Sequence, residues 1–202
     1  MYLPIIDSMI LIKMFVLVGV SSSTLKQNLF MPNLPLGEYR IFVEKFYRCE
    51  STRNHTLQFN CYLSKRTLNI TELKGNFTLL VPFDDTVILD INFASWSLSG
   101  GWKPNAIVYK TRKACTHFKN VLGKTWNSVI KDFNIPTSSC PIPVGTYISS
   151  GLDLRKLEEH NFPKVYFYGK YKMTISFKNE NNKLLGCAIL ELSLIRPWEK
   201  PI

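Results

Sequence analysis

Apolar and polar residues alternate along most of this chain, which is the pattern of strands with one buried face. The clearest example spans residues 170–178, where lysine, threonine and serine separate four large apolar side chains: Tyr171, Met173, Ile175 and Phe177. A second alternating run, residues 188–194, follows a polar cluster at 178–183. The two runs and the turn between them predict an antiparallel hairpin.

The sequon that begins at Asn76 orients an earlier strand. A glycan on Asn76 would have to point to water. On an extended segment the alternate positions then point inward, because successive side chains lie on opposite faces. We therefore predict an inner face that includes Phe77, Leu79 and Val81.

Polar residues orient the next two strands in the same way. Asp90 and Asn92 face outward and assign three residues to the inner face: Leu89, Ile91 and Phe93. Ser99-Gly100-Gly101 marks a turn. In the strand after it Lys110 faces outward, and the inner positions are Ile107 and Tyr109.

One segment has a different period. Between Cys115 and Phe133 apolar residues recur at spacings of three and four, which predicts one face of a helix that is broken near Gly123. Pro136 ends it. Cys115 and Cys140 bracket this helical insert, and closing a loop of that size with a disulfide is worth about 3–4 kcal/mol in the chain-entropy model. The apolar face of the helix includes Trp126, Ile130 and Phe133.

The length and the order of these elements predict the fold class. The chain has 202 residues, of which 46% are hydrophobic, so it can bury the core of one domain. Strands, a helical insert and further strands predict an all-β fold, namely an immunoglobulin-like antiparallel β-sandwich. A central helical segment is not typical of a true immunoglobulin domain.

Residues 1–23 have the order of a secretory signal peptide. An apolar run from Met14 to Val20 follows Lys13 and precedes three serines. The run is too short for a transmembrane anchor, the alternative interpretation, to cross a hydrocarbon core of ~30 Å. Translation from Met9 or Met14 is a further alternative. We expect the β-sandwich domain to span residues 24–202.

Glycosylation sequons and cysteines also predict a secreted, extracellular protein. Three sequons lie close together, at Asn54, Asn69 and Asn76. Five cysteines then read as a disulfide framework with one thiol left over. No cysteine or histidine group has zinc-ligand spacing, so we expect neither a metal site nor a cofactor.

The residues that could perform catalysis form no recognisable motif. The three histidines are interpreted as surface residues, and no Gly-x-Ser-x-Gly or phosphate-binding glycine loop occurs. The sequence thus favours a protein that is not an enzyme. The net charge of +10 is compatible with an anionic membrane surface. The lysines at 170–178 are better explained as a solvated strand face than as a nucleic-acid site.

The many large inner-face residues have two interpretations. They can form an ordinary solid core, or they can line an apolar cavity between two sheets that stay apart and accept a lipid. An acyl chain in such a cavity gains ~0.8 kcal/mol per buried methylene. The predicted ligand-binding residues are Phe77, Leu79, Val81, Leu89, Ile91, Phe93, Ile107, Tyr109, Trp126, Ile130, Phe133, Tyr171, Met173, Ile175 and Phe177.

Several short motifs resemble a known family. They are Cys140-Pro-Ile-Pro-Val-Gly-Thr-Tyr147, Phe162-Pro…Tyr168-Gly-Lys-Tyr-Lys172, Leu185-Gly-Cys187 and Asn92-Phe…Gly101-Trp-Lys-Pro104…Ala114-Cys115. In order and spacing the first three resemble the ML lipid-recognition superfamily, within it the ganglioside-activator-like and insect CheB-type chemosensory branch. The fourth resembles a related group of insect secreted proteins. The resemblance extends from about Tyr39 to Ile195.

The resemblance implies a secreted single-domain β-sandwich with a cavity between its sheets that takes up lipid. We expect the protein to be a monomer. The resemblance also implies a disulfide between Cys115 and Cys140. In the activator pattern Cys49 would form a disulfide with Cys187, whereas in the insect pattern it would form one with Cys61. The activator's extra cysteines in the helical region are absent, which favours chemosensation, with a pheromone or cuticular hydrocarbon as ligand and a membrane surface or receptor as partner. The competing hypothesis is a structural or receptor-like interaction module with a solid core and no ligand.

Overall fold

The computed structural model describes residues 34–50, 55–67 and 70–200, and those from Pro35 onward belong to one compact unit. Its larger sheet has five antiparallel strands in the order β2–β10–β9–β5–β6. Their bounds are β2 (Arg40–Arg48), β5 (Ile88–Ser97), β6 (Gly101–Thr111), β9 (Gly169–Lys178) and β10 (Leu184–Ile195).

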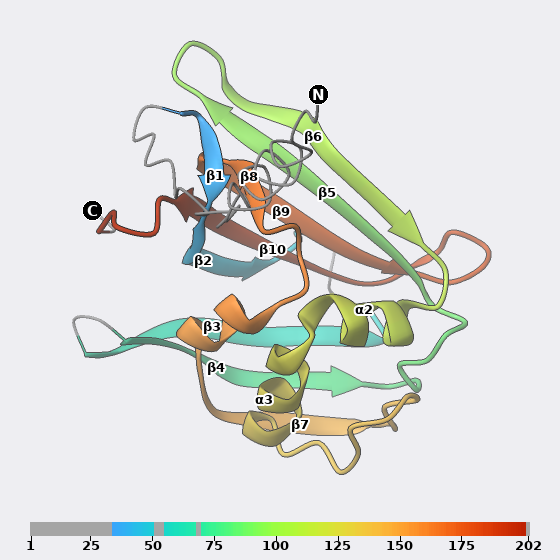
Figure 1. Cartoon of the computed structure of the whole chain (residues 1–202). Helices are drawn as coiled ribbons and strands as arrows, with labels where there is room; N and C mark the ends of the chain where they lie inside the picture. Colours follow the sequence, from blue (N-terminus) through green and yellow to red (C-terminus); the bar gives the residue numbers. More distant parts are fainter. Residues whose placement is uncertain (1–33, 51–54, 68–69, 201–202) are drawn as a thin grey trace, which may run out of the picture. The chain divides into compact units, whose positions relative to one another are not determined.

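A second antiparallel sheet has three strands in the order β3–β4–β7, and a short ribbon pairs β1 with β8. Figure 1 shows the five-stranded and three-stranded sheets as two layers, with the helices beside the smaller sheet. The bounds are β1 (Leu36–Glu38), β3 (Leu57–Thr67), β4 (Ile70–Leu79), β7 (Gly145–Asp153), β8 (Val165–Phe167), α2 (Ala114–Leu122), α3 (Lys124–Asp132) and the 3-10 helix η1 (Leu154–Glu159).

The structure confirms a mostly β fold built from antiparallel sheets. It also confirms the hairpin predicted from the alternating runs near the end of the chain, which is formed by β9 and β10. Residues 99–101 lie at the turn between β5 and β6, as the glycines predicted. The immunoglobulin-like arrangement and the inter-sheet cavity stay predictions.

The helical insert divides at Gly123, between α2 and α3. Gly123 has φ 58°, a conformation that favours glycine, and a Cβ there would lie 2.9 Å from the side-chain amide of Asn161. That amide donates to the carbonyl of Asn120 at 2.7 Å, and the Asn161 N–H donates to the carbonyl of Val121 at 2.9 Å. The glycine therefore lets the 160–162 segment tie down the end of α2.

Two disulfides connect distant parts of the chain, as expected in oxidising compartments such as the extracellular space. One joins Cys115 to Cys140 around the helices. The other joins Cys49 to Cys187, so the activator pairing is present and Cys61 is a free thiol. None of the helices in the described ranges is long and apolar enough to span a membrane.

Candidate functional site

The candidate site is the apolar layer between the two sheets. The strand register of the five-stranded sheet arranges its inner-face side chains in rows that cross the strands, because directly paired residues lie side by side on one face. One row extends across all five strands and is apolar throughout. We call it the central row, and it consists of Ile107, Phe93, Met173, Leu190 and Phe46.

Every member of the central row is partly exposed to solvent, although the rows on both sides of it are buried at their middle positions. The row on one side contains Ile91, Ile175 and Ala188. The row on the other side contains Tyr171, Leu192 and Val43. The sheet thus carries a strip of partly solvated hydrocarbon, and the strands β9 and β10 hold buried residues on both sides of it.

Beyond the Ile91 row, side chains from both sheets and from α2 fill the space between the layers. We call this region the closed end. The ring of Phe177 lies 5.5 Å from Phe59 of β3, 5.5 Å from Phe83 and 6.2 Å from Phe118 of α2. Leu89, beside Phe177 on β5, is 0% exposed. Aromatic pairs at these separations are typical of a well-packed core.

The helices complete the closed end with their predicted apolar face. Trp126 and Ile130 of α3, and Phe133 just after it, are buried in one cluster with Leu79 and Tyr147. The Phe77 ring lies 5.2 Å from that of Phe133. The indole N–H of Trp126 donates to the carbonyl of Ser138 at 3.0 Å, so its one polar atom is satisfied.

On the other side of the central row, β8 lies against Tyr171. The Tyr171 hydroxyl donates to the carbonyl of Phe167 at 3.0 Å, and the ring of Tyr166 lies 6.1 Å from that of Tyr171. Burial raises the pKa of Tyr171 above its usual value, because a phenolate would lose its hydration there. This hydroxyl is therefore a neutral structural donor.

A polar pair lies at the β6 edge of the layer. Tyr109, two residues beyond Ile107 on the same face of β6, is 39% exposed, and its hydroxyl lies 3.3 Å from Nδ1 of His117 on α2. These are hydrogen-bonding groups next to an apolar strip. They can orient the polar end of an amphipathic molecule.

Two of the pockets formed by described residues contain no member of the central row. One of about 380 Å³ lies between Lys110, Arg112 and Glu180, and one of about 210 Å³ lies between Tyr39, Glu158 and neighbouring residues. Both are lined mainly by polar and charged side chains. Within the described ranges no group of three His, Cys, Asp or Glu residues could hold a metal ion.

The structure separates the predicted site residues into groups. Phe93, Ile107 and Met173 lie in the central row, and Tyr109 lies at its edge. Val81 is partly buried against the core. Tyr171 is buried under β8. The closed end and the row beside it hold the other nine: Phe77, Leu79, Leu89, Ile91, Trp126, Ile130, Phe133, Ile175 and Phe177. That any of them lines a ligand cavity stays a prediction.

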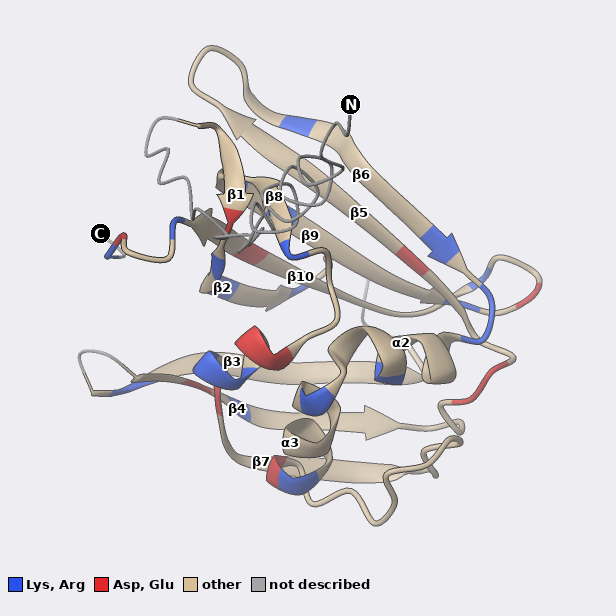
Figure 2. Ribbon diagram, viewed as in Figure 1, with Lys and Arg blue, Asp and Glu red and all other residues tan. Residues whose placement is uncertain are grey.

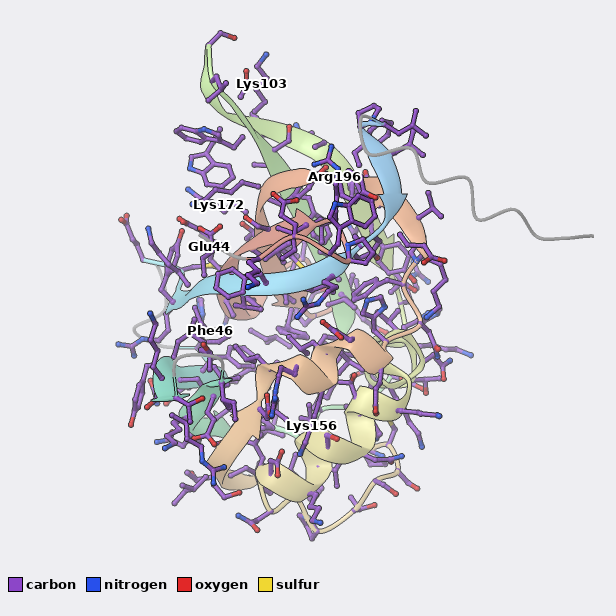
Figure 3. All side chains as sticks on the ribbon, turned by 60° about the vertical axis from the view of Figure 1, so that its left-hand side comes forward. Glu44, Phe46, Lys103, Lys156, Lys172 and Arg196 are labelled. Carbon is purple, nitrogen blue, oxygen red and sulfur yellow. A yellow bond between two sulfur atoms is a disulfide. The ribbon has the colours of Figure 1, made fainter. Side chains whose placement is uncertain are left out.

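Two members of the central row are missing from the predicted set, Phe46 and Leu190. The alternation of residues 188–194 already places Leu190 on the inner face. A β-bulge in β2 interrupts the alternation of the sequence, so the pattern does not reveal that Phe46 faces inward. Val43 pairs with Leu192 and Lys45 with Glu191, which leaves Glu44 as the extra residue. Figure 3 shows Glu44 and Phe46 on opposite sides of β2.

Of the predicted glycosylation sites, Asn76 lies on β4, on the face of the three-stranded sheet that it shares with Asn60. The Asn60 amide donates to the Asn76 side-chain oxygen at 3.3 Å. Asn54 and Asn69 lie outside the described residues, as does the predicted signal peptide, residues 1–23.

Comparison with protein-family models found no match for this chain. A search of curated protein sequences found no match either.

Proposed function

We propose that this protein is a secreted, non-enzymatic carrier of a lipid or other apolar ligand, and that the ligand lies along the central row. The observation that carries the proposal is the partial exposure of five adjacent apolar side chains beside rows whose middle positions are buried. Leaving such a strip in water is unfavourable, and a hydrocarbon chain would remove it from solvent.

The dimensions of the central row suit a single extended chain. Five strands side by side span about 19 Å from the first to the last, since neighbouring strands lie about 4.8 Å apart. An extended alkyl chain advances about 1.3 Å per carbon, because its C–C bonds are about 1.5 Å long, so about fifteen carbons match the row.

The hydrophobic effect alone is large enough for useful affinity. Each buried methylene contributes about 0.8 kcal/mol, so twelve contribute about 10 kcal/mol. Association costs of about 4–15 kcal/mol oppose this. A long chain would therefore bind and a short one would not, and no catalytic group is required.

The family, the biological role and the class of ligand are proposed from the sequence motifs. We infer an ML-type, immunoglobulin-like sandwich, a role in insect chemosensation, and a pheromone or cuticular hydrocarbon as ligand. The motifs quoted above support this inference. The disulfide between Cys49 and Cys187 matches the activator pattern and not the insect pattern, so it supports the ML-type sandwich but not the chemosensory role. The protein would act as a monomer and would meet a membrane surface or a receptor.

The test uses protein purified from the medium of eukaryotic secretory cells. Native mass spectrometry and organic extraction identify co-purified lipid, and displacement of a fluorescent fatty acid measures affinity. The key variant is Met173→Glu, which puts a carboxylate in the middle of the central row. Thr174→Glu is the matched control, because the next residue of β9 points to the opposite face.

We expect Met173→Glu to weaken probe binding by about tenfold or more, since an ionised group opposes burial of the chain. We expect Thr174→Glu to bind as wild type. Ile107→Glu, on the edge strand β6, repeats the test where the fold is least sensitive. Absence of co-purified lipid together with absence of probe binding would overturn the proposal and leave the solid interaction module.

A further inference from the structure

The turn between β5 and β6 carries a large apolar side chain with no cover. Leu98 lies in the three-residue loop between Ser97 and Gly101 and is 100% exposed. The loop is ordered by hydrogen bonds, with the Gly100 N–H donating to the carbonyl of Ser97 at 3.4 Å and the hydroxyls of Ser97 and Ser99 3.2 Å apart. Leu98 is therefore held at the apex of a defined hairpin.

Directly behind the apex two indole rings pack against each other. Trp96 and Trp102 are paired across the hairpin, with ring centroids 5.1 Å apart in an edge-to-face arrangement. Trp96 is nevertheless 47% exposed. Tryptophan is enriched where proteins meet the interface of a bilayer, because the indole has an apolar body and a polar N–H.

The surroundings of the indole pair are cationic. Between Asp90 and Lys110 the sequence contains Lys103 and no acidic residue, and Figure 2 shows the end of the hairpin without red. The ammonium of Lys172, on β9, lies 4.5 Å from the centre of the Trp102 ring. Figure 3 shows Lys103 and Lys172 near this end of the sheet.

Glu191, the carboxylate that lies 4.0 Å from the Lys172 ammonium, has further partners. Glu191 is 7% exposed, lies 3.2 Å from the Lys45 ammonium and accepts a hydrogen bond from the Tyr47 hydroxyl at 3.0 Å. These partners lower the pKa of Glu191 and outweigh the opposing effect of burial, so it stays ionised. Glu44 is paired with Lys170, so Lys45, Lys103, Lys170 and Lys172 carry four positive charges against two negative ones.

We propose that this hairpin tip, residues 96–103, docks the protein on an anionic lipid bilayer. Leu98 enters the acyl region, the two indoles lie at the headgroup level, and the lysines face the lipid phosphates and carboxylates. An apolar apex, amphipathic aromatics behind it and cations around it match the layers of a bilayer in order. The proposal does not depend on a ligand in the central row.

The test is flotation of the purified protein with vesicles of phosphatidylcholine alone or mixed with phosphatidylserine. We expect binding to the mixed vesicles, weaker binding to the neutral ones, and a blue shift of tryptophan fluorescence on binding. Leu98→Glu should lower partitioning by about tenfold or more, because it removes the inserted side chain and adds repulsion. Since Leu98 is fully exposed, this variant keeps the fold.

Ile148→Glu is the matched control, since Ile148 is an exposed apolar residue on β7 of the other sheet. It should bind vesicles as wild type does. Lys103→Glu should weaken binding to the mixed vesicles alone. The proposal is overturned if the wild type does not float with mixed vesicles, if Leu98→Glu floats equally well, or if Ile148→Glu loses binding to the same degree.

Discussion

The closed end and the central row belong to the same sheet and have the same kind of side chains, yet their solvent exposure differs. Phe177 and Leu89 are buried at the closed end, whereas Met173 and Phe93, on the same two strands, are partly exposed. Both pairs follow the same alternation in the sequence. The difference shows that a side chain on the inner face of a strand is not necessarily buried in the core.

What lies against each region explains the difference. At the closed end, β3 and α2 contribute aromatic rings that reach Phe177, and the Cys115–Cys140 disulfide holds the start of α2. On the far side of the central row, β8 lies against Tyr171. The proposed ligand site depends on this partial exposure of the central row.

The largest expected effect comes from truncating the middle of the closed end. Phe177→Ala should lower the free energy of unfolding by about 3–5 kcal/mol, since a buried ring is replaced by a cavity in a rigid aromatic cluster. Urea denaturation measures this. Tyr62→Ala is the control, because Tyr62 is an exposed aromatic residue on β3 and should cost less than about 1 kcal/mol. A similar loss in both variants would contradict a specifically packed closed end.

Removing the disulfide that clips the helices should have the next largest effect. The double variant Cys115→Ser/Cys140→Ser should lose about 3 kcal/mol, because a loop of this length gains chain entropy in the unfolded state. The sequence separation is 25 residues. Cys61→Ser, which breaks no disulfide, serves as control in the same denaturation experiment. The idea that the clip stabilises the closed end fails if the two proteins unfold at the same urea concentration.

The central row should respond more weakly to truncation. Phe93→Ala is expected to cost less than about 2 kcal/mol, because a partly exposed ring has less transfer free energy to lose and leaves no enclosed cavity. Its effect on fatty-acid binding should be the larger one. If Phe93→Ala destabilises the protein as much as Phe177→Ala does, the two regions are energetically equivalent and the comparison breaks down.

The pH dependence of the free energy of unfolding tests the region beside β8, on the far side of the central row. His160, between η1 and β8, is buried, so the surface position predicted for it was wrong. Its Nδ1 accepts a hydrogen bond from the Phe162 N–H at 3.0 Å. Burial, helped by the charge of Lys164, lowers the pKa of His160 below its usual value. The folded state thus favours neutral imidazole and the unfolded state binds the extra proton.

The sign follows from linkage. The stability that neutral His160 confers is present above pH about 6.5, and it decreases as the pH falls below that value toward the lowered pKa of the folded state. The free energy of unfolding should therefore be lower at pH about 5.5 than at pH about 7.5, and His160→Gln should reduce this difference. Both pH values lie above the ordinary pKa of carboxylates, which is roughly 4. An unchanged pH dependence in His160→Gln would assign the effect to other groups.

Much of the fold was predictable because its signals are local. The alternation from Tyr171 to Phe177 assigned β9 and its inner face, and the glycines after Ser99 placed the β5–β6 turn. The change of period after Cys115 located the helices, with their break at Gly123. Phe46 was not predictable in this way, since a bulge at Glu44 interrupts the alternation of β2.

The sequence by itself determined which side chains face inward, because neighbouring residues of a strand point to opposite faces whatever lies beyond them. Only the tertiary structure decided which of those side chains are covered. Whether Phe177 is buried and Met173 partly exposed depends on Phe59, Phe83 and Phe118. These come from segments far away in the chain, and burial arises from contacts that no local period encodes.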